Sequence, residues 1–196
     1  MTEVTMKVQI SPMLLIMSAA MILTKDINIR RVAIILSAAV IHELGHLAAA
    51  RILGISIKKL KLDIFGALLE TDTSYCSYKK EAALALAGPL ANILSALAIF
   101  IIRPDFDCSL FIISSCVFAS ANLMPAKGFD GGRALSCLLL LIMSPRAVKN
   151  VSDVLSFVCI FLLWTVSVYF IMRTGSYLSL FVFSAALFSK LFLSGK

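Results

Sequence analysis

Long apolar segments dominate this chain and restrict the folds that it can adopt. Hydrophobic residues make up 60% of its 196 residues, and the mean hydropathy is +0.98, far above the balance of soluble domains. Several runs approach or exceed the roughly 18–20 residues that a helix needs to cross a bilayer. We therefore expect an all-α polytopic membrane protein, in which residues 1–196 form a single transmembrane domain.

Six segments are candidates for crossing the membrane. They cover about residues 8–24, 32–53, 82–102, 109–143, 151–172 and 177–192. The first is preceded by little positive charge and lacks a convincing cleavage site, so we interpret it as a retained span and not as a signal peptide. The fourth is too long for one simple helix, and "NLMPAKGFDGGR" interrupts it with proline, glycine and polar residues.

The net charge of +7 is explained first by membrane topology, because Lys and Arg collect in cytoplasmic loops. Placing both termini in the cytoplasm puts most of these residues on the inner side. We therefore expect a multi-pass protein of the cell (inner) membrane, in contact with anionic lipid head groups. No basic surface indicates nucleic-acid binding, and the five cysteines do not suggest a disulfide framework.

Residues 55–72, "ISIKKLKLDIFGALLETD", alternate in part between apolar and polar side chains, which is typical of a strand. Gly66 would mark a turn or a bulge. We expect a small β element at the cytoplasmic membrane surface, between the second and third spans. Its open edge would bind an extended peptide by strand addition; the alternative is an interfacial connector with no substrate role.

The only two histidines lie four residues apart in "AAVIHELGHLAAA", within the second span. Residues i and i+4 share one face of a helix, so His42 and His46 can reach one metal ion. Zinc accepts such nitrogen ligands and leaves a position for water. Glu43 lies beside the pair and can take a proton from that water without binding the metal. Ionisable groups at membrane depth are costly and indicate function, which favours a metal site over two core histidines.

A catalytic zinc usually has a third protein ligand, and Asp130 in "GFDGG" is the best carboxylate for this role. It lies in the interrupted fourth span, where irregular backbone survives only if it is buried in protein or lines a wet cavity. Gly128, Gly131 and Gly132 would let the backbone bend and approach closely. The alternative is an Asp-Gly turn that only joins two half-helices.

Polar residues also interrupt the third span, in "ALAGPLANIL". Its Gly and Pro allow close packing and a local kink. Asn92 would hold a substrate backbone or polarise its carbonyl, or else form an interhelical hydrogen bond. Asn122 either shapes the turn that follows it or pairs with substrate. The candidate substrate-binding residues are Asn92, Asn122, Gly88, Pro89 and Gly66.

Three motifs, in order on separate spans, resemble the signatures of the site-2 proteases, which are intramembrane zinc metalloproteases. They are "HELGH" on the second span, "AGPLAN" on the third and "NLMPAKGFDGG" on the fourth. The resemblance implies that His42, His46 and Asp130 bind Zn²⁺ and that Glu43 is the catalytic glutamate. It also implies that the two asparagines handle substrate and that residues 55–72 receive it.

Within that family, the small size resembles the bacterial group that includes a sporulation protease acting on a sigma-factor precursor. The resemblance implies cleavage of transmembrane or membrane-associated regulators, such as an anti-sigma or pro-sigma factor, near the cytoplasmic face. It leaves open inhibitory or regulatory membrane proteins as further partners. Many members carry a PDZ or CBS domain; we expect neither here, and so no PDZ gating or ATP sensing.

Two other functions fit parts of the pattern. A zinc transporter can carry an HExxH-like motif, but a transport path would need more ligands and the chain has no other histidine. An inactive relative, acting as a membrane binding protein, would not need Glu43. The sequence therefore favours a zinc metalloendopeptidase that performs regulated intramembrane proteolysis.

Overall fold

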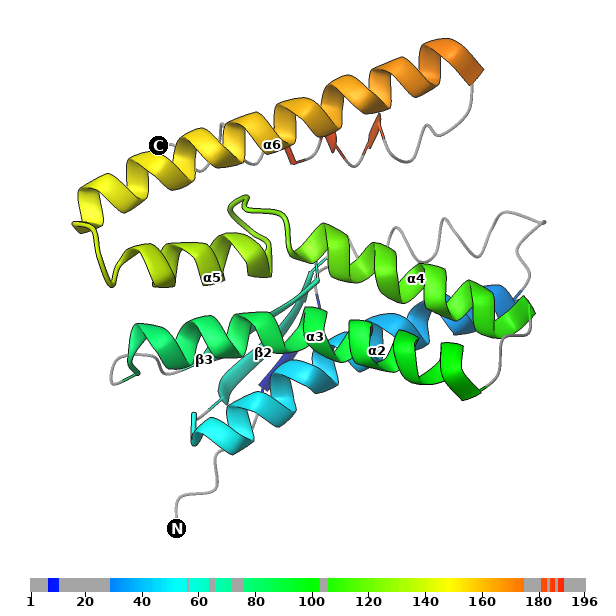
Figure 1. The fold of residues 1–196 in the computed structure, drawn as a ribbon, viewed down its shortest axis with the longest axis horizontal. Coiled ribbons are helices and arrows are strands. Elements are labelled where there is room, and N and C mark those ends of the chain that lie inside the picture. Colours follow the sequence, from blue (N-terminus) through cyan, green and yellow to red (C-terminus); the bar gives the residue numbers. More distant parts are fainter. Residues whose placement is uncertain are drawn as a thin grey trace. The chain divides into compact units, whose positions relative to one another are not determined.

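The computed structural model (Figure 1) describes residues 7–10, 29–55, 57–63, 66–71, 76–102, 106–174, 181–182, 184–185 and 187–188. The chain divides into two compact units, Met1–Asn122 and Leu123–Lys196, and each is described by itself. In chain order the elements are β1 (Lys7–Ile10), α2 (Ile29–Leu53), β2 (Ile57–Asp63), β3 (Gly66–Thr71), α3 (Tyr78–Ile102), α4 (Phe106–Asn122), α5 (Asp130–Leu139) and α6 (Pro145–Thr174).

Helices α2, α3 and α4 pack on one another in the first unit, where Figure 1 shows α2 in blue beside the green α3 and α4. Helix α2 ends in a Schellman motif, in which Gly54 takes the left-handed conformation (φ +68°). The N–H groups of Gly54 and Ile55 donate to the carbonyls of Arg51 and Ala50, at 3.3 and 2.9 Å. Ile55 then packs with Ala50 and Leu84 of α3, so the chain leaves α2 in a defined direction.

A three-stranded sheet of order β1-β2-β3 completes the first unit. β2 and β3 pair antiparallel, with Leu60 opposite Leu69 and Asp63 opposite Gly66. They fall within the segment whose alternation predicts strands, and Gly66 lies where the hairpin closes. The position of this sheet at the membrane surface stays a prediction.

The first strand corrects the expected start of the first span. Residues Lys7–Ile10 pair in parallel with β2, Lys7 opposite Lys59 and Ile10 opposite Leu62. The alternation of polar and apolar residues in "KVQI" suits a strand, and a helix cannot begin at Val8 while its backbone bonds to a sheet. The rest of that expected span, residues 11–24, lies outside the described residues.

Three described helices are long and apolar enough to cross a membrane: α2, α3 and residues 145–173 of α6. Large apolar side chains such as Leu94 and Phe100 lie on their outer faces, as suits helices in contact with lipid. The chain is therefore an integral membrane protein. The span expected at 177–192 lies largely outside the described residues, although residues 181–182, 184–185 and 187–188 are helical.

The expected interruption of the fourth segment is confirmed. Helix α4 ends at Asn122 and α5 begins at Asp130, and the irregular residues between them include Gly128 at φ +95°. The apolar part of α4, Cys108–Asn122, is shorter than the three long spans. In the second unit, α5 packs against α6.

Small residues bring α2 and α3 into close contact. A Cβ atom added to Gly45 would stand 2.6 Å from both the Ala87 carbonyl oxygen and the Ala91 Cβ. Such close approach of backbones is the usual role of small residues between membrane helices. Glycine at position 45 therefore sets the distance between the two helices.

We expect Gly45→Ala to lower stability by about 1–3 kcal/mol, because overpacking outweighs the gain in helix propensity. Thermal unfolding in detergent measures the effect. Ala48→Val, which adds methyl groups on an exposed face of the same helix, is the control and should leave stability nearly unchanged. Equal unfolding temperatures for Gly45→Ala and the wild type would contradict the close contact.

Candidate metal centre

Two buried imidazoles converge on the inner face of α2. His42 and His46 are 4% and 5% exposed, and their Nε2 atoms lie 3.2 Å apart. Two nitrogens that bind one tetrahedral ion at about 2.0–2.1 Å stand roughly 3.3 Å apart, so this spacing fits a shared zinc ion. The two rings meet edge to face, with centroids 4.8 Å apart.

Helix α3 fixes the orientation of His46. The His46 Nδ1 atom lies 2.9 Å from the Leu84 carbonyl oxygen in a buried contact. A carbonyl can only accept a hydrogen bond, so Nδ1 carries the proton and Nε2 presents a lone pair. This is the arrangement of a metal-binding histidine whose second nitrogen is held by a backbone carbonyl.

Asn92 holds His42 in the corresponding way. The amide is fully buried, and its Nδ2 atom lies 3.3 Å from His42 Nδ1, while Oδ1 has no hydrogen-bond partner among the described residues. A half-turn of the amide exchanges these atoms, and Oδ1 then accepts from a protonated Nδ1. In that orientation the Nε2 lone pairs of both histidines face the same point.

Gly88 lies directly against the histidine pair. A Cβ atom there would stand 2.3 Å from His46 Nε2 and 2.7 Å from His42 Nε2. The missing side chain therefore leaves room for an ion and its further ligands. Pro89, the next residue, is also buried, and α3 continues through it as one helix.

Glu43 follows His42 on α2 and is partly buried, with its Oε2 atom fully enclosed. Asn122, at the end of α4, donates from Nδ2 to the Phe118 carbonyl of its own helix at 3.0 Å. Gly66 is the first residue of β3, in the sheet. The structure thus gathers Gly88 and Asn92 around the histidines and places Asn122 and Gly66 on other elements.

Asp130 is the first residue of α5, in the second unit, and is half-buried. The backbone before it folds tightly against the first turn of the helix. Cβ atoms on Gly131 and Gly132 would stand 2.1 and 2.2 Å from the carbonyl oxygens of Leu123 and Ala126. The two glycines are therefore required by close approach, as the sequence predicts.

Comparison with known proteins gives a family match for part of the chain. The model of peptidase family M50 matches residues 31–104, which include both histidines and the Asn92 motif. Residues 31–104 are therefore similar to peptidase family M50. The resemblance to site-2 proteases is thereby confirmed.

Relatives of family M50 extend the match. A zinc metalloprotease of Methanocaldococcus jannaschii is 31% identical over 51% of this chain and 31% of its own length. Stage IV sporulation protein FB of Bacillus subtilis is 30% identical over 69% of this chain and 49% of its own length. The chain thus spans between about a third and a half of these curated relatives.

A solved structure shows the same fold. The site-2 protease from Methanocaldococcus jannaschii superposes with a TM-score of 0.64, at 17% identity, over 94% of this chain and 86% of the other. At this identity the likeness concerns the fold alone. It supports the arrangement of the helices described above.

For Asn92, we expect Asn92→Leu to lower zinc affinity about 10–100-fold, since that is the usual effect of removing a group that orients a metal-binding histidine. Asn92→Asp keeps an acceptor for His42 Nδ1 and should bind zinc nearly as well as wild type. Chelator competition on purified protein measures both. Ser95→Ala, one turn away and bonded only to its own helix, is the control. Unchanged zinc affinity in Asn92→Leu would instead favour a role in substrate binding.

For Gly88, we expect Gly88→Ala to abolish stoichiometric zinc binding while the protein still folds, because the added Cβ occupies the space beside both Nε2 atoms. Metal analysis and thermal unfolding of the same preparation separate the two effects. Ala98→Val, on an exposed face of α3, should retain zinc. Full zinc content in Gly88→Ala would show that the ion lies elsewhere.

Proposed function

We propose that this chain is an intramembrane zinc metalloendopeptidase. The observation that carries the proposal is the pair of buried imidazoles, whose Nε2 atoms lie 3.2 Å apart on a helix of membrane-crossing length. Residues at such depth must have their polar atoms satisfied, and the Nδ1 contacts to Leu84 and Asn92 leave the Nε2 atoms for a metal. The match of residues 31–104 to the model of peptidase family M50 and the names of the relatives support zinc.

His42, His46 and Asp130 would hold the ion. The carboxylate of Asp130 supplies the third protein ligand that catalytic zinc sites usually have. Its position at the start of α5, after the glycine-containing break, supports this assignment, as does the sequence resemblance of "GFDGG" to the family signature. The other acidic residues have no comparable setting in the sequence.

Glu43 would act as the general base and then as the general acid. Bound zinc would lower the pKa of a water molecule and polarise the scissile carbonyl. Glu43 accepts a proton from water as the water oxygen bonds to the carbonyl carbon. It then donates this proton to the amine nitrogen as the C–N bond breaks. Its position next to His42, with one oxygen enclosed, suits this exchange.

The substrates would be membrane-anchored regulatory proteins, cut near the cytoplasmic face. A helix shields its peptide bonds, so the substrate must unwind, and β3, an outer strand of the sheet, offers an edge for an extended segment. The similarity to a sporulation protein supports a regulator such as a pro-sigma or anti-sigma factor as the substrate class. Charge asymmetry supports cytoplasmic termini and six spans.

We expect Glu43→Gln to bind zinc as the wild type does but to cleave at least about 100-fold more slowly, since a general base contributes 10²–10⁴-fold. Co-expression with tagged single-span regulators measures cleavage, and metal analysis measures zinc. His42→Ala should lose zinc, and Asp130→Asn should bind zinc much more weakly than the wild type, with an affinity that can still be measured.

Unchanged cleavage by Glu43→Gln would refute the assigned base. Full zinc in both ligand variants would refute the ligand set. A transporter would be established instead if the wild-type protein carried zinc into liposomes without cleaving any substrate, and if the same variants abolished this zinc flux.

A further inference from the structure

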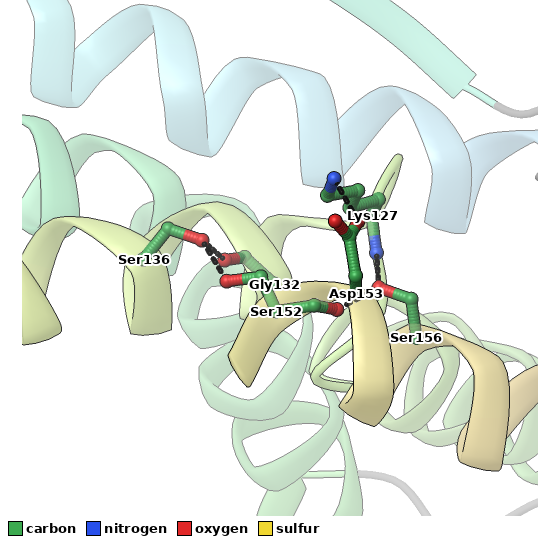
Figure 2. Close-up of polar contacts among 6 residues, drawn as sticks. All are labelled: Lys127, Gly132, Ser136, Ser152, Asp153 and Ser156. Carbon is green, nitrogen blue, oxygen red and sulfur yellow. Dashed lines mark hydrogen bonds and ion pairs between the residues drawn. The ribbon is translucent and has the colours of Figure 1, made fainter. Parts of the chain in front are cut away.

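Three residues of α6 contact the chain on both sides of Asp130. They are Ser152, Asp153 and Ser156, and we call them the α6 clamp (Figure 2). All lie in the second unit, and Ser152 and Ser156 are 7% and 0% exposed. Neither the family motifs nor the metal-site geometry described above includes them.

Before Asp130, the clamp holds Lys127. The Lys127 backbone N–H donates to Ser156 Oγ at 2.8 Å, and its ammonium group pairs with Asp153. Ser156 uses its own hydrogen to bond the Ser152 carbonyl at 2.6 Å, so its oxygen is available to accept from Lys127. The α6 clamp thus fixes both the main chain and the side chain of Lys127, which lies three residues before Asp130.

After Asp130, the clamp holds Ser136. Its hydroxyl donates to the Gly132 carbonyl at 2.8 Å and lies 3.0 Å from Ser152 Oγ. Because the Ser136 hydrogen is used within α5, Ser152 donates across to Ser136. This contact ties the first turns of α5, which carry Asp130, to the same face of α6.

We propose that the α6 clamp positions the Asp130 carboxylate for the metal, an inference that rests on the proposed function. Residues 127–136 include the glycines 128, 131 and 132. These glycines have no side chains that could restrain the backbone around Asp130. Hydrogen bonds from a buried face of a long helix supply the missing restraint. Ser152, Asp153 and Ser156 are therefore positioning residues that act through Asp130.

The first test removes one clamp hydroxyl. Ser156→Ala should lower zinc affinity about tenfold, the lower range for groups that support metal ligands, as measured by chelator competition on the purified full chain. The matched control is Ser167→Ala. Ser167 lies on the same helix, is equally buried and bonds Ser184 Oγ at 2.9 Å. If Ser167→Ala lowered zinc affinity as much as Ser156→Ala, the α6 clamp would only stabilise the fold, as other buried hydrogen bonds do, and the proposal would fail.

The second test uses the exposed ion pair, whose side chains are each 45% exposed, so that folding is not at risk. Asp153→Asn should lower zinc affinity about threefold, in keeping with the small strength of exposed pairs. Asp153→Glu keeps the carboxylate and should restore wild-type affinity. Equal affinities for all three proteins would show that the ion pair does not position the ligand.

A double-mutant cycle decides whether the effect runs through Asp130. In an Asp130→Asn background, Ser156→Ala should cause no further loss of zinc affinity. An equal loss in both backgrounds would overturn the proposal while leaving Asp130 as a ligand. If Asp130→Asn alone retained wild-type affinity, the ligand assignment itself would fail, and the clamp with it. Cobalt(II) absorption spectra of the same proteins give a second readout, because a displaced ligand alters the spectrum.

Discussion

Burial of two imidazoles between apolar helices is the constraint on which the first unit depends. A polar group taken out of water must find a partner or it destabilises the fold. Helix α3 supplies partners at two points, the Leu84 carbonyl for His46 and the Asn92 amide for His42. The packing of α2 on α3 therefore also orients the two candidate histidine ligands.

The same constraint explains the residues of "AGPLAN". Gly88 leaves space where both Nε2 atoms meet, and Asn92 lies one turn later, facing His42. Pro89 has no N–H to donate to the Ala85 carbonyl, so α3 lacks one backbone hydrogen bond at this point. The neighbouring residue Leu84 supplies the carbonyl that accepts from His46. Gly88 and Asn92 would both be unfavourable in an ordinary apolar helix, and both contact the histidine pair.

Local patterns were sufficient to predict much of this. The spacing of His42 and His46 predicts a shared face, and the glycines around Asp130 predict the break between α4 and α5. Alternation predicts β2 and β3. By contrast, the strand at Lys7–Ile10 was not predicted, because Val8 and Ile10 run into the apolar residues that follow and were therefore counted in the first span. Only the pairing with β2 reveals the strand.

Contacts between distant elements could not be predicted from the sequence, because periodicity shows a face but not what lies opposite it. Asn92 could serve substrate, a neighbouring helix or a histidine, and only the 3.3 Å contact links it to His42. The α6 serines did carry a signal: Ser152 and Ser156 are spaced i and i+4 in an apolar helix, which places two hydroxyls on one face. That spacing does not say that the face meets Lys127 and Ser136.

The hydrogen bonds around the candidate ligands lie within single units. The histidines are held by α3, and the segment that carries Asp130 is held by α6. Sites whose ligands are fixed by surrounding hydrogen bonds lose less conformational freedom when a metal binds. A chain rich in apolar helices has few polar side chains for this purpose. We therefore expect the loss of a buried one, such as Asn92 or Ser156, to affect the site more than the loss of an exposed hydrogen bond would.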